Sequence, residues 1–310
     1  KKQCIMYKYL FMSWLILFSC GEANQKLSTY NSQKTFTAIP SSHSGITFNN
    51  QLSENLSTGE NILDFDFFFN GAGLAIADFD NDGLEDVFFA GNQVENRIYK
   101  NEGDLKFTDK TQTASVNPPA KRWSNGVSIA DVNQDGLLDI YISQGGPNGP
   151  EKRQNLLLIN QGDFTFSEEA TKYGLQDNGI STQAVFFDYD KDGDLDCFVM
   201  NESPLIGFDP VAFYSMMRTH SNSLLHTSSS HLYKNEGGRF VDVSDQAGVL
   251  LPSFGLGLCV SDINNDGWLD IYVANDYYIP DAIYLNDQSG GFTNGTKDVV
   301  HQSSFYSMGV

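Results

Sequence analysis

The chain has 310 residues, of which 40% are hydrophobic, so it is long enough to bury a substantial core. Its 39 acidic and 19 basic residues give a formal net charge of −20, and such a surface repels the phosphate backbone of nucleic acids, so nucleic-acid binding is not expected. Glycine is frequent and 13% of the residues are aromatic, which favours short strands joined by tight turns over helices.

The N-terminal residues 1–20 are predicted to be a targeting segment. An apolar run over residues 9–18 is too short to span a bilayer as a helix and is typical of the central part of a signal peptide. The run ends in a stretch that resembles a bacterial lipobox, which predicts lipidation of Cys20. The alternative is an ordinary secretory signal whose cysteine is incidental. Residues 21–44 are polar and are predicted to be a flexible tether.

This segment predicts an exported protein. We expect a lipid-anchored protein of the bacterial outer membrane, cell surface or periplasm, which contacts the membrane only through its anchor.

A nine-residue motif, Asp-x-[Asp/Asn]-x-Asp-Gly-x-x-Asp, recurs four times in the chain. The copies begin at Asp78, Asp131, Asp188 and Asp262, at spacings of 53, 57 and 74 residues. Each copy stands between two short apolar runs, and two more short runs follow. Four short strands at this period are typical of a blade of a β-propeller.

The predicted strands have the same order in every unit. The first runs are Leu74–Ala77, Val127–Ala130, Ala184–Phe187 and Leu258–Ser261, and the second are Val87–Ala90, Ile140–Ser143, Cys197–Met200 and Ile271–Ala274. The third runs end at Asn101, Asn160, Asn235 and Asn286, and the fourth begin at Phe107, Phe166, Phe240 and Phe292. The nearly continuous apolar character of the first runs suits strands buried on both faces.

The fold class predicted for residues 45–310 is therefore an all-β propeller of four-stranded blades with Asp-rich calcium loops. Residues 305–310 echo residues 122–127, which lead into the second motif, so four blades and the start of a fifth are expected. Four blades and a fragment would leave sheet edges uncovered, so the propeller is expected to continue beyond this chain.

The motif has the chemistry of a calcium loop. Calcium takes six to eight oxygen ligands, and side chains at positions 1, 3 and 5, the carbonyl of position 7 and the carboxylate of position 9 would supply them. Glycine at position 6 permits a sharp turn with positive φ. The predicted ligand side chains are Asp78, Asp80, Asp82, Asp86, Asp131, Asn133, Asp135, Asp139, Asp188, Asp190, Asp192, Asp196, Asp262, Asn264, Asp266 and Asp270.

Fourteen of these sixteen residues are acids, and carboxylates packed without a cation repel one another. We therefore expect about four structural Ca²⁺ sites, with weaker binding where Asn133 or Asn264 replaces an acid. The alternative is that the loops are Asp-rich turns capped by their own side chains.

The 202–230 insertion interrupts the third unit between its second and third strands. Asp209 followed by Pro210 predicts the start of a short helix through Arg218, with Phe213 on its apolar face beside Met216 and Met217. The helix is expected to pack on its own blade; the alternative is a lid that binds a partner. Separately, Cys197 and Cys259 lie in apolar runs and are predicted to be buried free thiols.

No catalytic motif is apparent. The five histidines show no metal spacing, and no nucleophile elbow, phosphate-binding loop or dinucleotide fingerprint is present. We therefore predict no catalytic residues and no cofactor other than Ca²⁺.

The repeated motif, with the Leu-Tyr-x-Asn-x-Gly-x-Phe pattern that follows it, resembles the FG-GAP/VCBS-type repeats of integrin α-chain propellers and of many bacterial surface proteins. Residues 45–48, 69–73, 91–93, 275–278 and 307–310 are more similar to the cartilage-acidic-protein-like family, whose members often end in an ASPIC/UnbV domain. The resemblance implies a calcium-stabilised, seven-bladed propeller outside the cytoplasm. The Phe-Gly and Gly-Ala-Pro signatures of integrin repeats are eroded here, and the family has no single assigned activity.

The expected function is that of a binding protein. A calcium-binding surface or periplasmic propeller would act as a scaffold for a protein or glycan ligand. One alternative is a carbohydrate-active enzyme, a lyase or glycosidase, which would need a pocket on the propeller axis lined by acids or histidines that bind no calcium. The other is a structural spacer, which would have no concave polar pocket. Fold alone does not decide among them.

Overall fold

The computed structural model describes residues 36–118, 122–147, 149–205, 209–219, 222–300, 302–304 and 306–309. The chain divides into a unit over Lys1–Ile39 and a compact unit over Pro40–Val310. The predicted signal segment, Cys20 and most of the tether lie outside the described residues, and residues 36–39 form no helix or strand. No helix in the described part of the chain is long and apolar enough to cross a membrane. All the helices and strands assigned in the described residues lie in the unit over Pro40–Val310.

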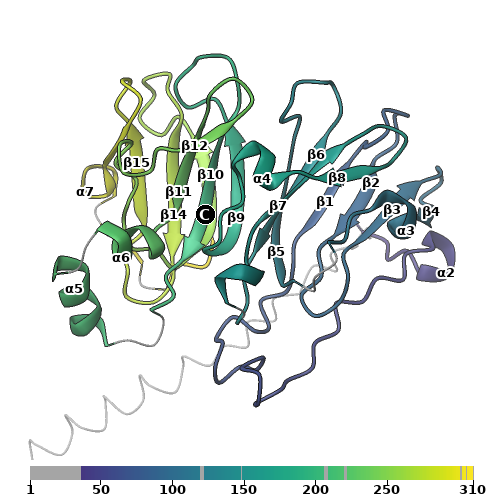
Figure 1. Ribbon diagram of the computed structural model, residues 1–310, viewed down its shortest axis with the longest axis horizontal. Helices are drawn as coiled ribbons and strands as arrows, with labels where there is room; N and C mark the ends of the chain where they lie inside the picture. The colour runs from purple at the N-terminus through teal and green to yellow at the C-terminus, as the bar shows by residue number, and fades with distance from the viewer. Residues whose placement is uncertain are drawn as a thin grey trace, which may run out of the picture. The chain divides into compact units, whose positions relative to one another are not determined.

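In the described part of the chain, sixteen strands form four antiparallel sheets of four strands, each a meander in chain order (Figure 1). Sheet 1 comprises β1 (Leu74–Ala77), β2 (Asp86–Phe89), β3 (Arg97–Asn101) and β4 (Phe107–Asp109). Sheet 2 comprises β5 (Ser124–Ala130), β6 (Asp139–Gln144), β7 (Leu156–Asn160) and β8 (Phe166–Glu168). Sheet 3 comprises β9 (Ile180–Phe187), β10 (Asp196–Glu202), β11 (His231–Asn235) and β12 (Phe240–Asp242). Sheet 4 comprises β13 (Gly255–Ser261), β14 (Asp270–Asn275), β15 (Ala282–Asn286) and β16 (Phe292–Asn294).

The prediction of four-stranded all-β units is thus confirmed, and every predicted run lies on the expected strand. The strands β5, β9 and β13 begin three or four residues earlier than predicted. Register shifts in the strand pairs of sheets 2, 3 and 4 accompany this extension. A bulge lets a strand continue past the point where its apolar pattern breaks, so hydrophobic alternation alone misses these residues.

Apolar side chains fill the space between consecutive sheets, as expected for stacked propeller-like blades. One cluster joins Phe88 and Ile98 of sheet 1 to Ile140 and Leu156 of sheet 2. Similar clusters lie between sheets 2 and 3 and between sheets 3 and 4. The first strands of consecutive sheets lie next to one another, β1 beside β5, β5 beside β9 and β9 beside β13.

The expectation that first strands are buried on both faces is wrong. In β1, Leu74 and Ile76 are 55% and 61% exposed, and Cys259 on β13 is exposed although it was expected to be buried. The fully buried strands are β6 and β10, the second strands of sheets 2 and 3, and β7, the third strand of sheet 2. A second strand has a hydrogen-bonded neighbour on each side and packs on both faces, whereas a first strand stands at the edge of its sheet. Cys197 on β10 is a buried free thiol, as predicted.

Short helices lie before, between and after the strands of the sheets. They are α2 (Ser41–Ser44), α3 (Thr111–Ala114), α4 (Ala170–Tyr173), α7 (Thr296–Val299) and the 3₁₀ turn Pro150–Lys152. Of these helices, α3 and α4 connect consecutive sheets. These single turns were not predicted, because they are too short to show a hydrophobic period.

The insertion forms α5 (Pro210–Thr219) and α6 (Asn222–Thr227). Asp209 Oδ1 accepts a hydrogen bond from the N–H of Val211 (2.9 Å), as predicted for an N-cap. Phe213 is fully buried against Phe254 and Tyr278, which belong to the fourth unit. The expectation that this helix packs on its own blade is therefore wrong for Phe213; Met216 and Met217 lie outside the described side chains.

Candidate metal sites and pockets

The four Asp-rich loops, loop 1 (78–86), loop 2 (131–139), loop 3 (188–196) and loop 4 (262–270), connect the first and second strands of the four sheets. In loop 2 the carboxylate of Asp131 accepts hydrogen bonds from the N–H groups of Asp135 (3.0 Å) and Gly136 (2.9 Å). The other three loops repeat the contact from position 1 to position 6. The first carboxylate therefore closes each loop, as in an Asp-rich turn.

Backbone conformation explains the glycine at position 6. Its φ lies between +86° and +95° in all four loops, as predicted, and this region suits glycine. Position 4 also has positive φ, between +57° and +60°, although it is Asn81, Gln134, Lys191 or Asn265. Two left-handed residues in nine curl the backbone so that the side chains of positions 1, 3 and 9 can face one another.

Loops 1 and 3 bring together three carboxylates that fit a cation. Oxygens of Asp78, Asp80 and Asp86 lie within 4.8 Å of one another, and the equivalent residues of loop 3 do the same. Among the described residues, nothing donates a hydrogen bond to the buried oxygens Asp80 Oδ1, Asp188 Oδ1 and Asp190 Oδ1. Buried carboxylate oxygens without a donor are costly in the absence of a cation, so both loops fit Ca²⁺.

Lysine compensates the extra acid of loops 1 and 3. Lys100 on β3 contacts Asp80 and, at 2.6 Å, Asp82; Lys234 on β11 contacts Asp190 and, at 3.3 Å, Asp192. The attraction of these carboxylates raises the pKa of Lys234.

Loops 2 and 4 have no such lysine, because Ile159 and Leu285 occupy the equivalent strand positions. Here the amide of Asn133 or Asn264 donates to the position-5 carboxylate, at 2.9 and 3.0 Å. The four carboxylates and one lysine of loops 1 and 3 therefore carry the same net charge as the three carboxylates of loops 2 and 4. Sequence reasoning missed this pairing, although the Tyr-Lys-Asn stretches of units 1 and 3 show it.

The aspartate at position 9 braces the loop to the sheet. Asp139 is fully buried and accepts hydrogen bonds from the N–H groups of Val132 (2.9 Å) and Asn160 (2.8 Å). Asp86, Asp196 and Asp270 make the same two contacts in their own sheets. Burial raises the pKa of Asp139 to about 6 and that of Asp196 to about 7. Position 9 is therefore a structural residue as well as a candidate ligand.

The asparagine that ends each third strand completes this Asp–Asn brace. Its amide donates to the carbonyl of loop position 8, for example from Asn160 to Leu138 O (3.1 Å). In sheets 2 and 4 it also reaches the preceding sheet, from Asn160 to Phe79 O and from Asn286 to Tyr189 O, both at 2.8 Å. The recurrent asparagine was visible in the sequence, but its role was not.

A pocket of about 370 Å³ lies where the first strands begin, at the ends opposite to the metal loops. We call it the converging-strand pocket. Equivalent residues of successive units surround the pocket. Four of them stand six positions before the four motifs, and the fifth is the residue of segment 305–310 that aligns with Asn125: Ala72, Asn125, Thr182, Leu256 and Met308. Phe65 and Phe67 form a wall, and Glu202, the last residue of β10, also lines it. The strands approach closely here, since a Cβ on Gly126 would stand 2.3 Å from the Thr182 carbonyl oxygen.

Glu202 is the acid of this pocket and belongs to no metal loop. It is 3% exposed, and no described residue donates a hydrogen bond to its carboxyl group. Burial, followed by the charge of Asp276, raises the pKa of Glu202 well above its ordinary value. Sequence reasoning missed Glu202, because only the fold brings the end of β10 to the first strands.

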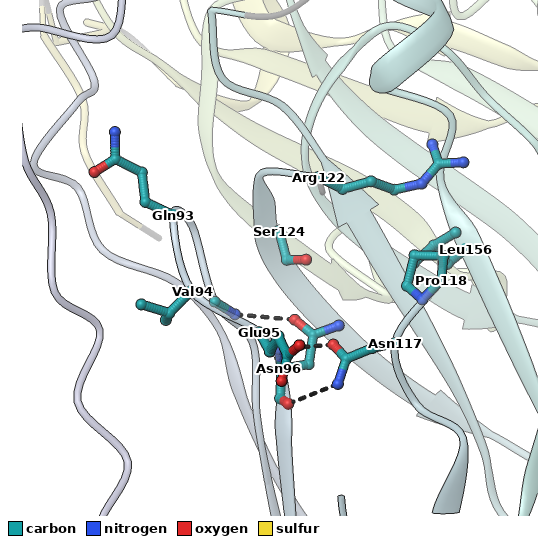
Figure 2. Close-up of a pocket in the computed structure, with 10 residues that line it drawn as sticks. Gln93, Val94, Glu95, Asn96, Asn117, Pro118, Arg122, Ser124 and Leu156 are labelled. Carbon is teal, nitrogen blue, oxygen red and sulfur yellow. Dashed lines mark hydrogen bonds between the residues drawn. The ribbon is translucent and has the colours of Figure 1, made fainter. Parts of the chain in front are cut away.

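A second cavity, of about 270 Å³, lies between sheets 1 and 2 (Figure 2). Asn96 and Asn117 face each other across it, with hydrogen bonds of 2.9 and 3.1 Å between their backbone and side-chain groups. Arg122 points away from this pair and donates to the carbonyl oxygen of Gln154 (3.0 Å). The hydrogen bonds of these groups are therefore internal: Asn117 ties the connection after α3 to the start of β3, and Arg122 contacts the segment before β7.

A buried ion pair anchors the connection between sheets 2 and 3 to β11. Asp177, between α4 and β9, contacts His231 Nδ1 and accepts hydrogen bonds from Tyr233 Oη (2.8 Å) and the N–H of Gly179 (2.7 Å). His231 Nε2 lies 2.9 Å from the carbonyl oxygen of His226. Burial opposes both charges, yet the pair holds the pKa of His231 at about 9 and that of Asp177 at about 2. All these contacts are internal, so the pair is structural.

Two solved structures are similar in fold at low TM-scores. A lectin of Agrocybe aegerita, described as recognising non-reducing terminal N-acetylglucosamine, gives a TM-score of 0.41 with 18% identity, over 75% of this chain and 52% of the lectin. The biofilm matrix protein Bap1 of V. cholerae gives 0.36 with 14% identity, over 71% and 27% of the two chains.

Sequence comparison supports the resemblance found in the motifs. Residues 78–142 match the model of the FG-GAP-like repeat. Human cartilage acidic protein 1 is 25% identical over 239 residues, 77% of this chain and 33% of the relative. The same protein of Xenopus tropicalis is 26% identical over 238 residues, 77% and 34% of the two chains. The chain thus spans about a third of the length of these relatives; it contains an FG-GAP-like repeat and is similar to cartilage acidic protein 1.

Proposed function

We propose that this chain is part of a calcium-stabilised β-propeller that binds a protein or glycan ligand outside the cytoplasm. The observation that carries the proposal is the recurrence of one Asp-rich loop at the same edge of four sheets, with buried carboxylate oxygens that lack a donor in loops 1 and 3. Calcium would neutralise these carboxylates and fix the turn between first and second strands. The ligand side chains would be those of positions 1, 3, 5 and 9.

Binding is favoured over the two alternatives by the converging-strand pocket. A spacer needs no concave pocket. A glycosidase uses two carboxyl groups on either side of the scissile bond, and Glu202 is the only acid among the described residues that line this pocket. We therefore propose a binding protein and not an enzyme.

The exported location and the lipid anchor at Cys20 belong to the same proposal and rest on the N-terminal sequence. Incorporation of a labelled fatty acid that is lost in Cys20→Ala would support the anchor. Labelling that persists in this variant would exclude it.

Removal of calcium is expected to lower thermal stability strongly. A site saturated a hundredfold above its Kd contributes about 2.7 kcal/mol, and about 1 kcal/mol moves the Tm of a domain of this size by roughly 2 °C. With several sites filled, we expect the Tm in about 10 mM Ca²⁺ to exceed that in a chelator by at least about 10 °C. Calorimetry with Mg²⁺ as the control ion measures this; an unchanged Tm would mean that the loops are self-capped turns.

Replacing Lys100 by isoleucine, the residue at the equivalent position 159 of sheet 2, is expected to make loop 1 more dependent on calcium. Without the lysine, Asp80 and Asp82 lose their counter-charge in the chelator, so the Tm should fall there. The affinity of this loop for Ca²⁺ should rise roughly three- to tenfold, because a unit charge at about 5 Å is worth about 1 kcal/mol even in water.

Calcium titration and paired Tm measurements test this prediction. Lys106→Ile, at an exposed lysine of the β3–β4 turn, is the matched control and should change neither quantity. Weaker calcium binding by Lys100→Ile would contradict the compensation argument.

A further inference from the structure

The polar side chains that line the converging-strand pocket differ in whether they have hydrogen-bond partners within the protein. The amide nitrogen of Asn125 donates to the carbonyl oxygen of Ser181 (2.9 Å), and the hydroxyl of Thr182 donates to that of Gly255 (2.8 Å). Both side chains therefore have partners within the protein. Glu202 has none among the described residues, although it is 97% removed from solvent contact. Its carboxyl oxygens do not belong to the fully buried polar atoms that lack a partner, so they keep contact with the solvent in the pocket and are accessible to a small ligand.

Aromatic and aliphatic side chains form part of the pocket wall, beside Asn70 and Gly71. Phe65 and Phe67 are each 8% exposed and make edge-to-face contacts with Trp123 (5.8 Å) and Tyr277 (6.0 Å). Leu256 and Met308 add aliphatic surface. Fixed aromatic rings beside a carboxylate attract a cation that has carbon substituents.

The charges near the pocket also favour a cationic ligand. None of the described residues that line the pocket is basic, so Glu202 has no internal counter-ion there. Asp276 is close enough to act on Glu202, and the whole chain carries a net charge of −20. The local field therefore favours a positively charged ligand and opposes an anionic one.

We infer that the converging-strand pocket binds an organic ammonium group, which pairs with the ionised form of Glu202 and stabilises that form against the effect of burial, while its carbon chain packs on Phe65 and Phe67. A volume of about 370 Å³ is within the range of small-molecule sites. A sugar ring would need several polar partners at once. Besides Glu202, Asn70 alone among the described lining residues adds a polar side chain that is not engaged within the protein. The inference rests on the binding function proposed above and gives its ligand a chemical class.

The ammonium group can come from a free amine or from a lysine side chain of a partner protein. Titration calorimetry in calcium with n-butylammonium chloride, Nα-acetyl-lysine amide, n-butanol and methyl β-glucoside separates these sources. We expect saturable binding of at least one ammonium probe and none of n-butanol. Tighter binding of the lysine derivative indicates a protein ligand, and tighter binding of butylammonium indicates a small amine. Binding of the glucoside without either ammonium probe overturns the inference.

Variants of the pocket test the role of its carboxyl group. Glu202→Gln keeps the shape and removes the charge, so ammonium binding should weaken by at least about thirtyfold. The matched control Glu236→Gln, at an exposed site in the β11–β12 turn, should bind as the unchanged protein does. Met308→Trp fills the pocket from a position that is 70% exposed and should abolish binding with little effect on folding. Unchanged ammonium binding in Glu202→Gln or in Met308→Trp overturns the inference.

Failure of this inference is distinguishable from failure of the proposed function. If no ammonium probe binds while calcium still raises the Tm, only the ligand class is wrong. If calcium has no effect on the Tm, the calcium-stabilised propeller is wrong whatever the probes do.

Discussion

Replacing His231 by alanine is expected to destabilise the protein by about 3–5 kcal/mol, because it leaves the buried carboxylate of Asp177 without its cation. The side chains are 6% and 1% exposed, so water cannot take over the role of the lost partner. Chemical unfolding at pH 7 in calcium measures the loss.

His226→Ala is the matched control, since its ring stacks on His231 but its side chain is 40% exposed. Its cost should stay below about 1 kcal/mol. Equal effects of the two substitutions would contradict the importance of the buried pair.

The same pair predicts how stability depends on pH. The pKa of His231 is raised to about 9 in the fold, so its contribution is fully present below the unfolded pKa of about 6.5 and is lost as the pH rises through 9. The pKa of Asp177 is lowered to about 2, so its contribution is present above about 3.9 and is lost as the pH falls through 2. The His231 contribution should therefore decline between about pH 6.5 and 9.

Replacing Asp139 by alanine is expected to cost about 3–4 kcal/mol even in a chelator. The change removes two hydrogen bonds to a carboxylate and leaves the N–H groups of Val132 and Asn160 buried without acceptors. Loss of a calcium ligand alone would not lower stability when no calcium is present. Unfolding in EDTA therefore isolates the contribution of the Asp–Asn brace.

Asp135→Ala in the same loop is the matched control. Asp135 is exposed, so its removal should matter mainly in calcium. Equal stability of Asp139→Ala and the unchanged protein in EDTA would refute the structural role of position 9.

Much of the fold follows from local patterns. The strands of the described residues overlap the apolar runs predicted for them, although β5, β9 and β13 begin earlier, and positive φ at position 6 follows from the glycine there. These features depend on residues close in sequence, which one chain displays directly.

The features that prediction missed depend on contacts between distant segments. Cys259 looks like a core residue in its apolar run, but it lies on a first strand at the edge of its sheet. Phe213 has the spacing of a helix that covers its own unit, but it packs against Phe254 of the next one. Lys100 and Glu202 join their sites only through the pairing of strands. Contacts of this kind leave no periodic hydrophobic pattern in the sequence from which they could be predicted.

The alternation of the four loops shows that the repeating unit of this chain is a pair of sheets. Odd sheets have the lysine-compensated loop, while even sheets have the asparagine loop and the asparagine that reaches back to the preceding sheet. Asn160 and Asn286 thus tie sheet 2 to sheet 1 and sheet 4 to sheet 3, but Asn235 makes no such bond to sheet 2. In a nearest-neighbour description the interfaces within pairs and between pairs have different energies. Variants in which two consecutive sheets are added or removed together should therefore still fold. Adding or removing a single sheet would instead place two sheets with the same type of loop next to each other.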